Sequence, residues 1–290
     1  MIAQLLGILA QSVLEKSGKL HHVLIDADGN EHAPSTGQVR IISLVPSLTE
    51  LLFAMGLGDN VVGRTAFCIE PMGRIEDVPV VGGTKTSEMD KLVALNPTHV
   101  LVNIDETPKE LAEQIAATGA DVVVTHPNTP VDNIALFELI GGLFHRTAQA
   151  AELVHALEAE LAELAELAQA SIWPERKVLY LIWKRPWMTV SRDTYIANML
   201  SLFGMKTMCH DPDRRYPEVT INAELLAEAD LILFSSEPFP FADKHRDAFA
   251  DTHKIAKEPR LLAIDGRMVS WYGNRAIDGL KYLRTFTSQL

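Results

Sequence analysis

TAQAAELVHALEAELAELAELAQASI, residues 147–172, is the stretch of sequence around which the rest of the chain is arranged. It contains no Gly or Pro and is dominated by Ala, Leu and Glu, which are strong helix formers. A helix of this length extends for about 40 Å at 1.5 Å per residue. The stretch predicts one continuous helix over residues 147–172, stopped by Pro174. The helix presents one apolar face, because its leucines recur at steps of three and four: Leu153, Leu157, Leu161, Leu164 and Leu167.

Short apolar strands alternate with helices on both sides of this helix. Such alternation is typical of a parallel or mostly parallel sheet covered by helices. A unit of helix, break and apolar strand at residues 89–103 recurs at residues 222–235, which indicates two related halves. The predicted strands are 39–44, 60–63, 100–102 and 122–124 before the helix, and 178–182, 231–234 and 261–264 after it.

The sequence therefore predicts an α/β fold with two α/β lobes, each with a mostly parallel central sheet, joined by one long interlobe helix. An ordinary long surface helix in a single α/β domain is the alternative. The predicted boundaries are an N-terminal extension at 1–38, a first lobe at 39–146, the interlobe helix at 147–172 and a second lobe at 173–290.

Composition narrows the classes of partner. The net charge of −12 argues against nucleic acid, which attracts basic surfaces. No apolar run approaches the ~20 residues of a membrane span, so membrane insertion is not expected. Cys68 and Cys209 are too few for a disulfide scaffold or a paired-cysteine metal site.

The N-terminus leaves the localisation open. A secretory signal has a Lys or Arg before its apolar segment and an A-x-A cleavage site after it. The apolar segment here, Ile2 to Leu9, has no preceding Lys or Arg and no clear A-x-A site after it. A short amphipathic helix is the expectation for this segment, and both a periplasmic and a cytoplasmic location are compatible with the sequence.

No motif predicts catalysis. Gly56 and Gly58 are followed by the next glycine only at Gly63, so the dinucleotide-binding spacing fails, and neither a GxSxG elbow nor an HExxH motif is present. We therefore expect no enzyme, no catalytic residue, no resident cofactor and no metal site. A direct metal receptor built on His126 or His210 with acidic partners is a weaker alternative.

Aromatic and basic residues instead gather in loops that follow strands of the second half. In parallel α/β sheets, ligands bind outside the carboxyl ends of the strands, and aromatic walls with a few polar groups are typical of small-molecule sites. Each aromatic could alternatively fill a small hydrophobic core beneath its own loop. The candidate ligand-binding residues here are Trp183, Arg185, Trp187, Phe239, Trp271, Tyr272 and Arg275.

Loops of the first half provide a facing set of candidates. They also follow predicted strands, so that two lobes would place them opposite the aromatic loops. These candidates are Ser47, Phe67, Lys85 and Glu106.

The sequence resembles the class III periplasmic binding proteins, the helical-backbone receptors for cobalamin, iron-siderophores, haem and metals. RIISLVPSLTELLFAMGLGDNVVGRTAFC and VGGTKTSEMDKLVALNPTHVLVN are similar to their first lobe. WKRPWMTVSRDTYIANML and SWYGNRAIDGL are similar to the second lobe of the cobalamin-binding branch. The resemblance covers about residues 39–290.

This resemblance implies the substrate-binding component of an ABC importer, with a corrinoid or another bulky metal chelate held between the lobes. It implies that Phe67, Trp187 and the Trp271–Tyr272 pair line the pocket. It also implies docking on a permease through one acidic residue per lobe. Asp90 fits the first position, and the second falls on Asn222, with Glu224 two residues on.

We expect a monomer with a small-molecule ligand and a possible ABC permease as partners. The competing hypothesis is a cytoplasmic ligand-binding protein or enzyme on the same scaffold.

Overall fold

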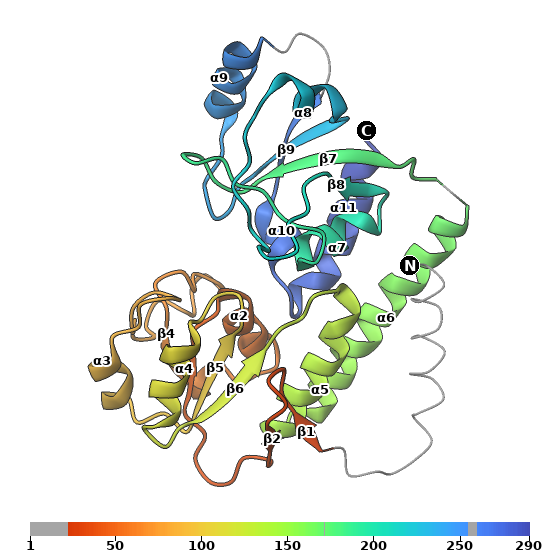
Figure 1. Ribbon diagram of the computed structural model, residues 1–290. Coiled ribbons are helices and arrows are strands. Elements are labelled where there is room, and N and C mark those ends of the chain that lie inside the picture. The colour runs from red at the N-terminus through yellow and green to blue at the C-terminus, as the bar shows by residue number, and fades with distance from the viewer. Residues whose placement is uncertain (1–22, 171, 255–259) are drawn as a thin grey trace.

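The computed structural model describes residues 23–170, 172–254 and 260–290. The predicted N-terminal amphipathic helix at Ile2 to Leu9 lies outside the described residues. Within them the chain forms two α/β lobes connected by one long helix (Figure 1). The predicted fold class is confirmed.

The first lobe is built on a parallel four-stranded sheet in the order β4-β3-β5-β6. Helices cover both faces: Leu101 of β5 packs into the large core shared with α2 and α5, whereas its neighbours Val100 and Val102 pack against α3 and α4. The strands are β3 (Ile41–Ser43), β4 (Val61–Arg64), β5 (His99–Asn103) and β6 (Asp121–Thr125), and the helices are α2 (Pro46–Ala54), α3 (Met89–Ala94), α4 (Lys109–Ala116) and α5 (Asn133–Leu143), with 3₁₀ turns η1 (Gly58–Asn60) and η2 (Pro130–Asp132).

The second lobe repeats this topology. Its parallel sheet has the order β10-β9-β7-β8, so that in both lobes the first strand along the chain lies between the second and the third. The strands are β7 (Arg176–Leu181), β8 (Met205–Thr207), β9 (Leu231–Ser235) and β10 (Arg260–Ile264), and the helices are α7 (Tyr195–Ser201), α8 (Ala223–Glu228), α9 (Asp243–His253), α10 (Gly266–Ser270) and α11 (Arg275–Thr287).

The long helix α6 (Thr147–Gln169) runs along one side of both lobes (Figure 1). It packs against α5 of the first lobe and α11 of the second. Leu157, Leu161 and Leu164 are buried, as the leucine spacing predicts. The helix ends at Gln169, three residues before the predicted end at 172.

Three elements of the second lobe were not predicted: β8, α9 and the five-residue helix α10. β8 has three residues and depends on pairing with β7 for its strand geometry. α9 is polar, and Phe249 is its one fully buried residue, so its sequence carries little helical periodicity.

The N-terminal extension contributes a small hairpin, β1 (Leu24–Ile25) and β2 (Glu31–His32), beside β6. His32 joins the two together: its Nε2 lies 3.1 Å from Asp26 and its Nδ1 lies 3.0 Å from Asp121. Asp26 also accepts a hydrogen bond from the Val124 backbone N–H. Because each ring nitrogen faces a carboxylate, the protonated imidazolium matches both partners.

Stability is expected to fall as the pH rises because of His32. Burial works against the charged ring, but hydrogen bonds and charges from Asp121 and Asp26 outweigh it and raise the pKa of His32 above 6.5. Its contribution is therefore complete below the unfolded-state pKa and is lost as the pH rises through the folded-state pKa. Urea unfolding from about pH 6 to about pH 9 should show wild type losing stability relative to His32→Gln. Parallel pH profiles of the two proteins would contradict this, and His155→Gln, on the exposed side of α6, serves as the control.

Candidate functional site

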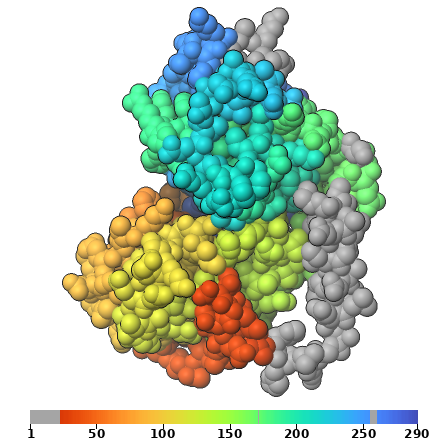
Figure 2. Space-filling model, viewed as in Figure 1, coloured from red at the N-terminus to blue at the C-terminus, as the bar shows by residue number. Residues whose placement is uncertain are grey.

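The two sheets direct the loops at their carboxyl ends toward each other. Asp105, which follows β5, contacts Arg215 of the second lobe, and Glu70, which follows β4, contacts Arg267. Figure 2 shows the molecular surface hollowed between the lobes. This interlobe surface, formed by the loops after the strands of both sheets, is the candidate ligand-binding site.

A bidentate ion pair connects α2 to the start of α11. Arg275 donates from Nε and Nη2 to the two carboxylate oxygens of Glu50 at 2.8 and 2.5 Å. The guanidinium also lies 5.0 Å from the centre of the Trp271 ring. The side chains of Arg275 and Glu50 are only 13% and 16% exposed. Arg275 is thus occupied in joining the lobes, which corrects the expectation that it is available to a ligand.

A second polar group extends from Glu70 to Trp271. The Arg267 guanidinium lies 3.0 Å from Glu70 of the first lobe and 3.9 Å from Glu237. The Trp271 indole N–H donates to Glu237 at 2.9 Å. Trp271 is 7% exposed and so lies at the floor of the surface. Glu237 follows β9 and was not predicted, although its place after a strand was a usable signal.

A third connection is centred on Asp105. Arg215 contacts one of its carboxylate oxygens at 2.9 Å through Nε, and the Tyr216 hydroxyl donates to the other at 3.1 Å. Arg215 also donates to the Asn128 side chain. Burial opposes the charge of Asp105, but the neighbouring His126, whose Nε2 lies 3.5 Å from the carboxylate, and the charge of Arg215 lower its pKa overall. Sequence reasoning missed this network because its members are far apart in the chain.

Glu106 differs from these neighbouring carboxylates. Its side chain forms no hydrogen bond or ion pair with any residue that the structure describes, yet it remains half-buried between the lobes. Burial, together with the negative charges of Asp105 and Glu237 and against the positive charge of Lys85, raises its pKa to about 7. Because Glu237 belongs to the second lobe, charges from both lobes influence Glu106.

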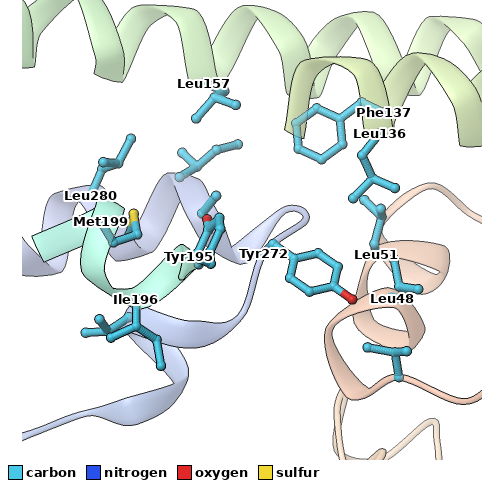
Figure 3. Packing of buried hydrophobic residues seen from close by; sticks show 14 of the residues in the cluster. Leu48, Leu51, Leu136, Phe137, Leu157, Tyr195, Ile196, Met199, Tyr272 and Leu280 are labelled. Carbon is cyan, nitrogen blue, oxygen red and sulfur yellow. The ribbon is translucent and has the colours of Figure 1, made fainter. Parts of the chain in front are cut away.

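Tyr272 and Ser47 lie beneath that surface. Tyr272 is 6% exposed and belongs to the apolar core that continues from one lobe to the other. In Figure 3 its ring lies between Tyr195 of the second lobe and Leu48 and Leu51 of α2. Among the described residues, the hydroxyl of Tyr272 has no partner with hydrogen-bond geometry. Ser47, at the start of α2, is 3% exposed. Both side chains are therefore buried in this packing, and their contact with a ligand stays a prediction.

Other predicted aromatics are accessible. Trp183 is 39% exposed, and its ring meets the edge of Phe239 with 5.6 Å between the ring centres. Phe67, in the loop after β4, is 61% exposed. Ile104, two residues before Glu106, is also exposed. These side chains supply apolar surface to the loops that follow the strands, and their contact with a ligand stays a prediction.

Trp187 is more enclosed than Trp183. Its ring stacks on Phe241 and meets Phe249 edge-on, within the small core between the sheet and α8 and α9. Phe241 in turn contacts Phe239, with 4.6 Å between the ring centres, so Trp187 joins the same row of aromatic rings and its contact with a ligand stays a prediction. Arg185 and Lys85 are exposed.

The predicted docking residues lie on the surface. Asp90 and Glu224 are exposed in the first turns of α3 and α8, which precede corresponding strands of the two lobes. Asn222 caps α8, accepting the Leu225 backbone N–H at 2.8 Å. Asparagine is among the best residues for this role, so its presence there has a local structural reason.

The described residues bear on three other features: a metal site, a disulfide and a membrane-spanning helix. Among them, no group of three or more His, Cys, Asp or Glu side chains is arranged to hold a metal ion. Cys68 and Cys209 are free thiols. In the same part of the chain, no helix combines the length and apolarity needed to cross a membrane.

Comparison with known proteins agrees with this architecture. Residues 41–261 match the family described as periplasmic binding protein. An uncharacterized ABC transporter substrate-binding lipoprotein, YvrC of Bacillus subtilis (strain 168), is 25% identical over 84% of this chain and 78% of its own. A vitamin B12-binding protein of Vibrio cholerae serotype O1 is 28% identical over 68% of this chain and 70% of its own.

Solved structures show the same fold. The periplasmic vitamin B12-binding protein BtuF of Vibrio cholerae has a TM-score of 0.74 at 20% identity, covering 86% of this chain and 96% of its own. The periplasmic heme-binding protein RhuT from Roseiflexus sp. RS-1 has a TM-score of 0.73 at 23% identity, covering 87% and 99%. The family match over most of the chain and the two-lobed topology lead to one conclusion: this chain belongs to the periplasmic binding protein family, whose members bind solutes rather than transform them.

Proposed function

We propose that this protein is the substrate-binding component of an ABC importer and holds a corrinoid, or another bulky metal chelate, between its lobes. The observation that carries the proposal is the interlobe surface, where exposed Trp183 and Phe67 accompany the carboxyl of Glu106, which has no partner among the described residues. Rigid aromatic faces provide a large contact area at low entropic cost, which suits a broad macrocycle. Relatives named for vitamin B12 and heme binding support this class of ligand.

The proposed partner is an ABC permease. Asp90 and Glu224 present one exposed carboxylate on each lobe, and such rim charges pair with cations on a partner surface. A location outside the cytoplasm follows from this role and is supported by the lipoprotein and periplasmic descriptions of the relatives.

Tryptophan fluorescence tests the ligand class. Titration with cobalamin, dicyanocobinamide, haem or a ferric siderophore is expected to quench the emission with saturation, because metal macrocycles absorb near indole emission. Trp183→Phe should remove a large part of the quenching, since Trp183 is the exposed indole at the interlobe rim.

Trp173→Phe is the matched control, because Trp173 packs on Phe203 at the far end of α6. It should leave the affinity unchanged. Absence of a saturable response to every one of these ligands would reject the proposed function.

A further inference from the structure

The cations that join the lobes are already occupied. Arg275 pairs with Glu50, Arg267 with Glu70 and Arg215 with Asp105, each across the interlobe surface. A ligand carboxylate would therefore have to displace one of these protein carboxylates to reach an interlobe arginine. Arginine is the side chain best suited to bind a carboxylate in two places, so its occupation disfavours acidic ligands.

Glu106 is left as the carboxyl without a partner. Its side chain is half-buried, makes no hydrogen bond or ion pair with the described residues, and is influenced by the negative charge of Glu237 from the other lobe. Asp105 adds negative charge on the same loop, whereas Lys85 is the positive group that influences it. Tyr272, neutral and buried, lies close enough for Glu106 to raise its pKa.

We infer that Glu106 selects for a ligand whose edge carries amides rather than carboxylates, an inference that rests on the proposed function. An amide offers both a donor N–H and an acceptor C=O. It can therefore donate to Glu106 as carboxylate or accept from Glu106 as carboxylic acid. A ligand carboxylate only accepts, so it is compatible with the protonated form alone and is repelled by the charged form.

The two kinds of ligand are expected to differ in pH dependence. With a pKa of about 7, Glu106 changes from mostly protonated to mostly ionised over the neutral range. A ligand that requires the protonated form loses about tenfold in affinity between about pH 6 and about pH 8, since each pH unit above the pKa costs up to tenfold. A ligand that accepts either form loses less than about twofold.

Two corrins with the same ring test this difference. Dicyanocobinamide carries peripheral amides, and dicyanocobyrinic acid carries carboxylates at the corresponding positions. Wild type should bind dicyanocobinamide with nearly constant affinity across this range, and bind dicyanocobyrinic acid more weakly as the pH rises. Glu106→Gln should abolish the pH dependence and strengthen binding of dicyanocobyrinic acid at about pH 8 by about tenfold. Lys85→Gln removes the positive charge that opposes Glu106 and should lower the affinity for dicyanocobyrinic acid further.

The outcomes separate the two proposals. Suppose that dicyanocobinamide binds, but Glu106→Gln keeps the pH dependence of dicyanocobyrinic acid binding, or wild type has no such pH dependence. The selection by Glu106 is then overturned and the proposed function stands. Preference of wild type for the acid at about pH 8 would overturn it as well. If neither corrin binds, and cobalamin, haem and the siderophore also fail, the proposed function itself is rejected and the inference falls with it. Circular dichroism of each variant verifies folding.

Discussion

An Arg275→Met variant is expected to unfold with about 3 kcal/mol less free energy than wild type, because it leaves the Glu50 carboxylate without its partner. The Glu50 side chain is only 16% exposed, so water replaces the lost hydrogen bonds poorly. The substitution also removes the cation from the face of Trp271. Urea denaturation followed by circular dichroism measures the change.

The double variant Glu50→Gln, Arg275→Met distinguishes the loss of the pair from the loss of packing. It should recover most of the stability, because no charge is then left buried without a partner. Lys91→Ala is the surface control, since the Lys91–Glu88 pair is more than half exposed and should contribute less than about 1 kcal/mol. Equal effects of Arg275→Met and Lys91→Ala would contradict a structural role for the interlobe pair.

Leu157→Ala is expected to lower the free energy of unfolding by about 3 kcal/mol through the cavity that it leaves. Leu157 is fully buried on α6 and belongs to the core that includes Tyr195, Leu280 and Phe137 (Figure 3). Both lobes contribute to this core, so the effect should appear in one cooperative urea transition.

Leu167→Ala provides a matched control on the same helix, because Leu167 is only partly buried near the end of α6. Leu167→Ala should lower the free energy of unfolding by less than half as much as Leu157→Ala, because Leu167 buries less apolar area when the protein folds. Similar losses for both variants, or two separate transitions, would argue against a shared core along α6.

The periodic parts of the fold were accessible from the sequence. The leucine spacing of residues 147–172 predicted α6 and its buried face, and the alternation of apolar strands with helices predicted two parallel sheets. Both features depend on neighbours in the chain. The missed elements have weak local patterns: β8 depends on its pairing with β7, and α9 buries only Phe249 fully.

The candidate site was less accessible. Loop composition identified Trp183, Phe239, Phe67 and Glu106, which lie in loops at the carboxyl ends of the strands. Trp187 has the same kind of loop position, but its ring packs on Phe241 and Phe249 and is partly buried, whereas Trp183 is exposed. Local sequence does not distinguish the two placements, because both residues follow the same strand and only tertiary contacts decide how far each ring is covered.

The sequence by itself determined the two-lobed architecture, the connecting helix and the loops that carry the candidate binding residues, because hydrophobic periodicity acts over a few residues. Only the tertiary structure decided which charges are available to a ligand. Arg275 and Glu50, like Arg215 and Asp105, are separated by long stretches of chain and meet only because the fold packs the two lobes together. The same packing leaves Glu106 without a partner among the described residues, because Arg215, Arg267 and Arg275 pair with other carboxylates.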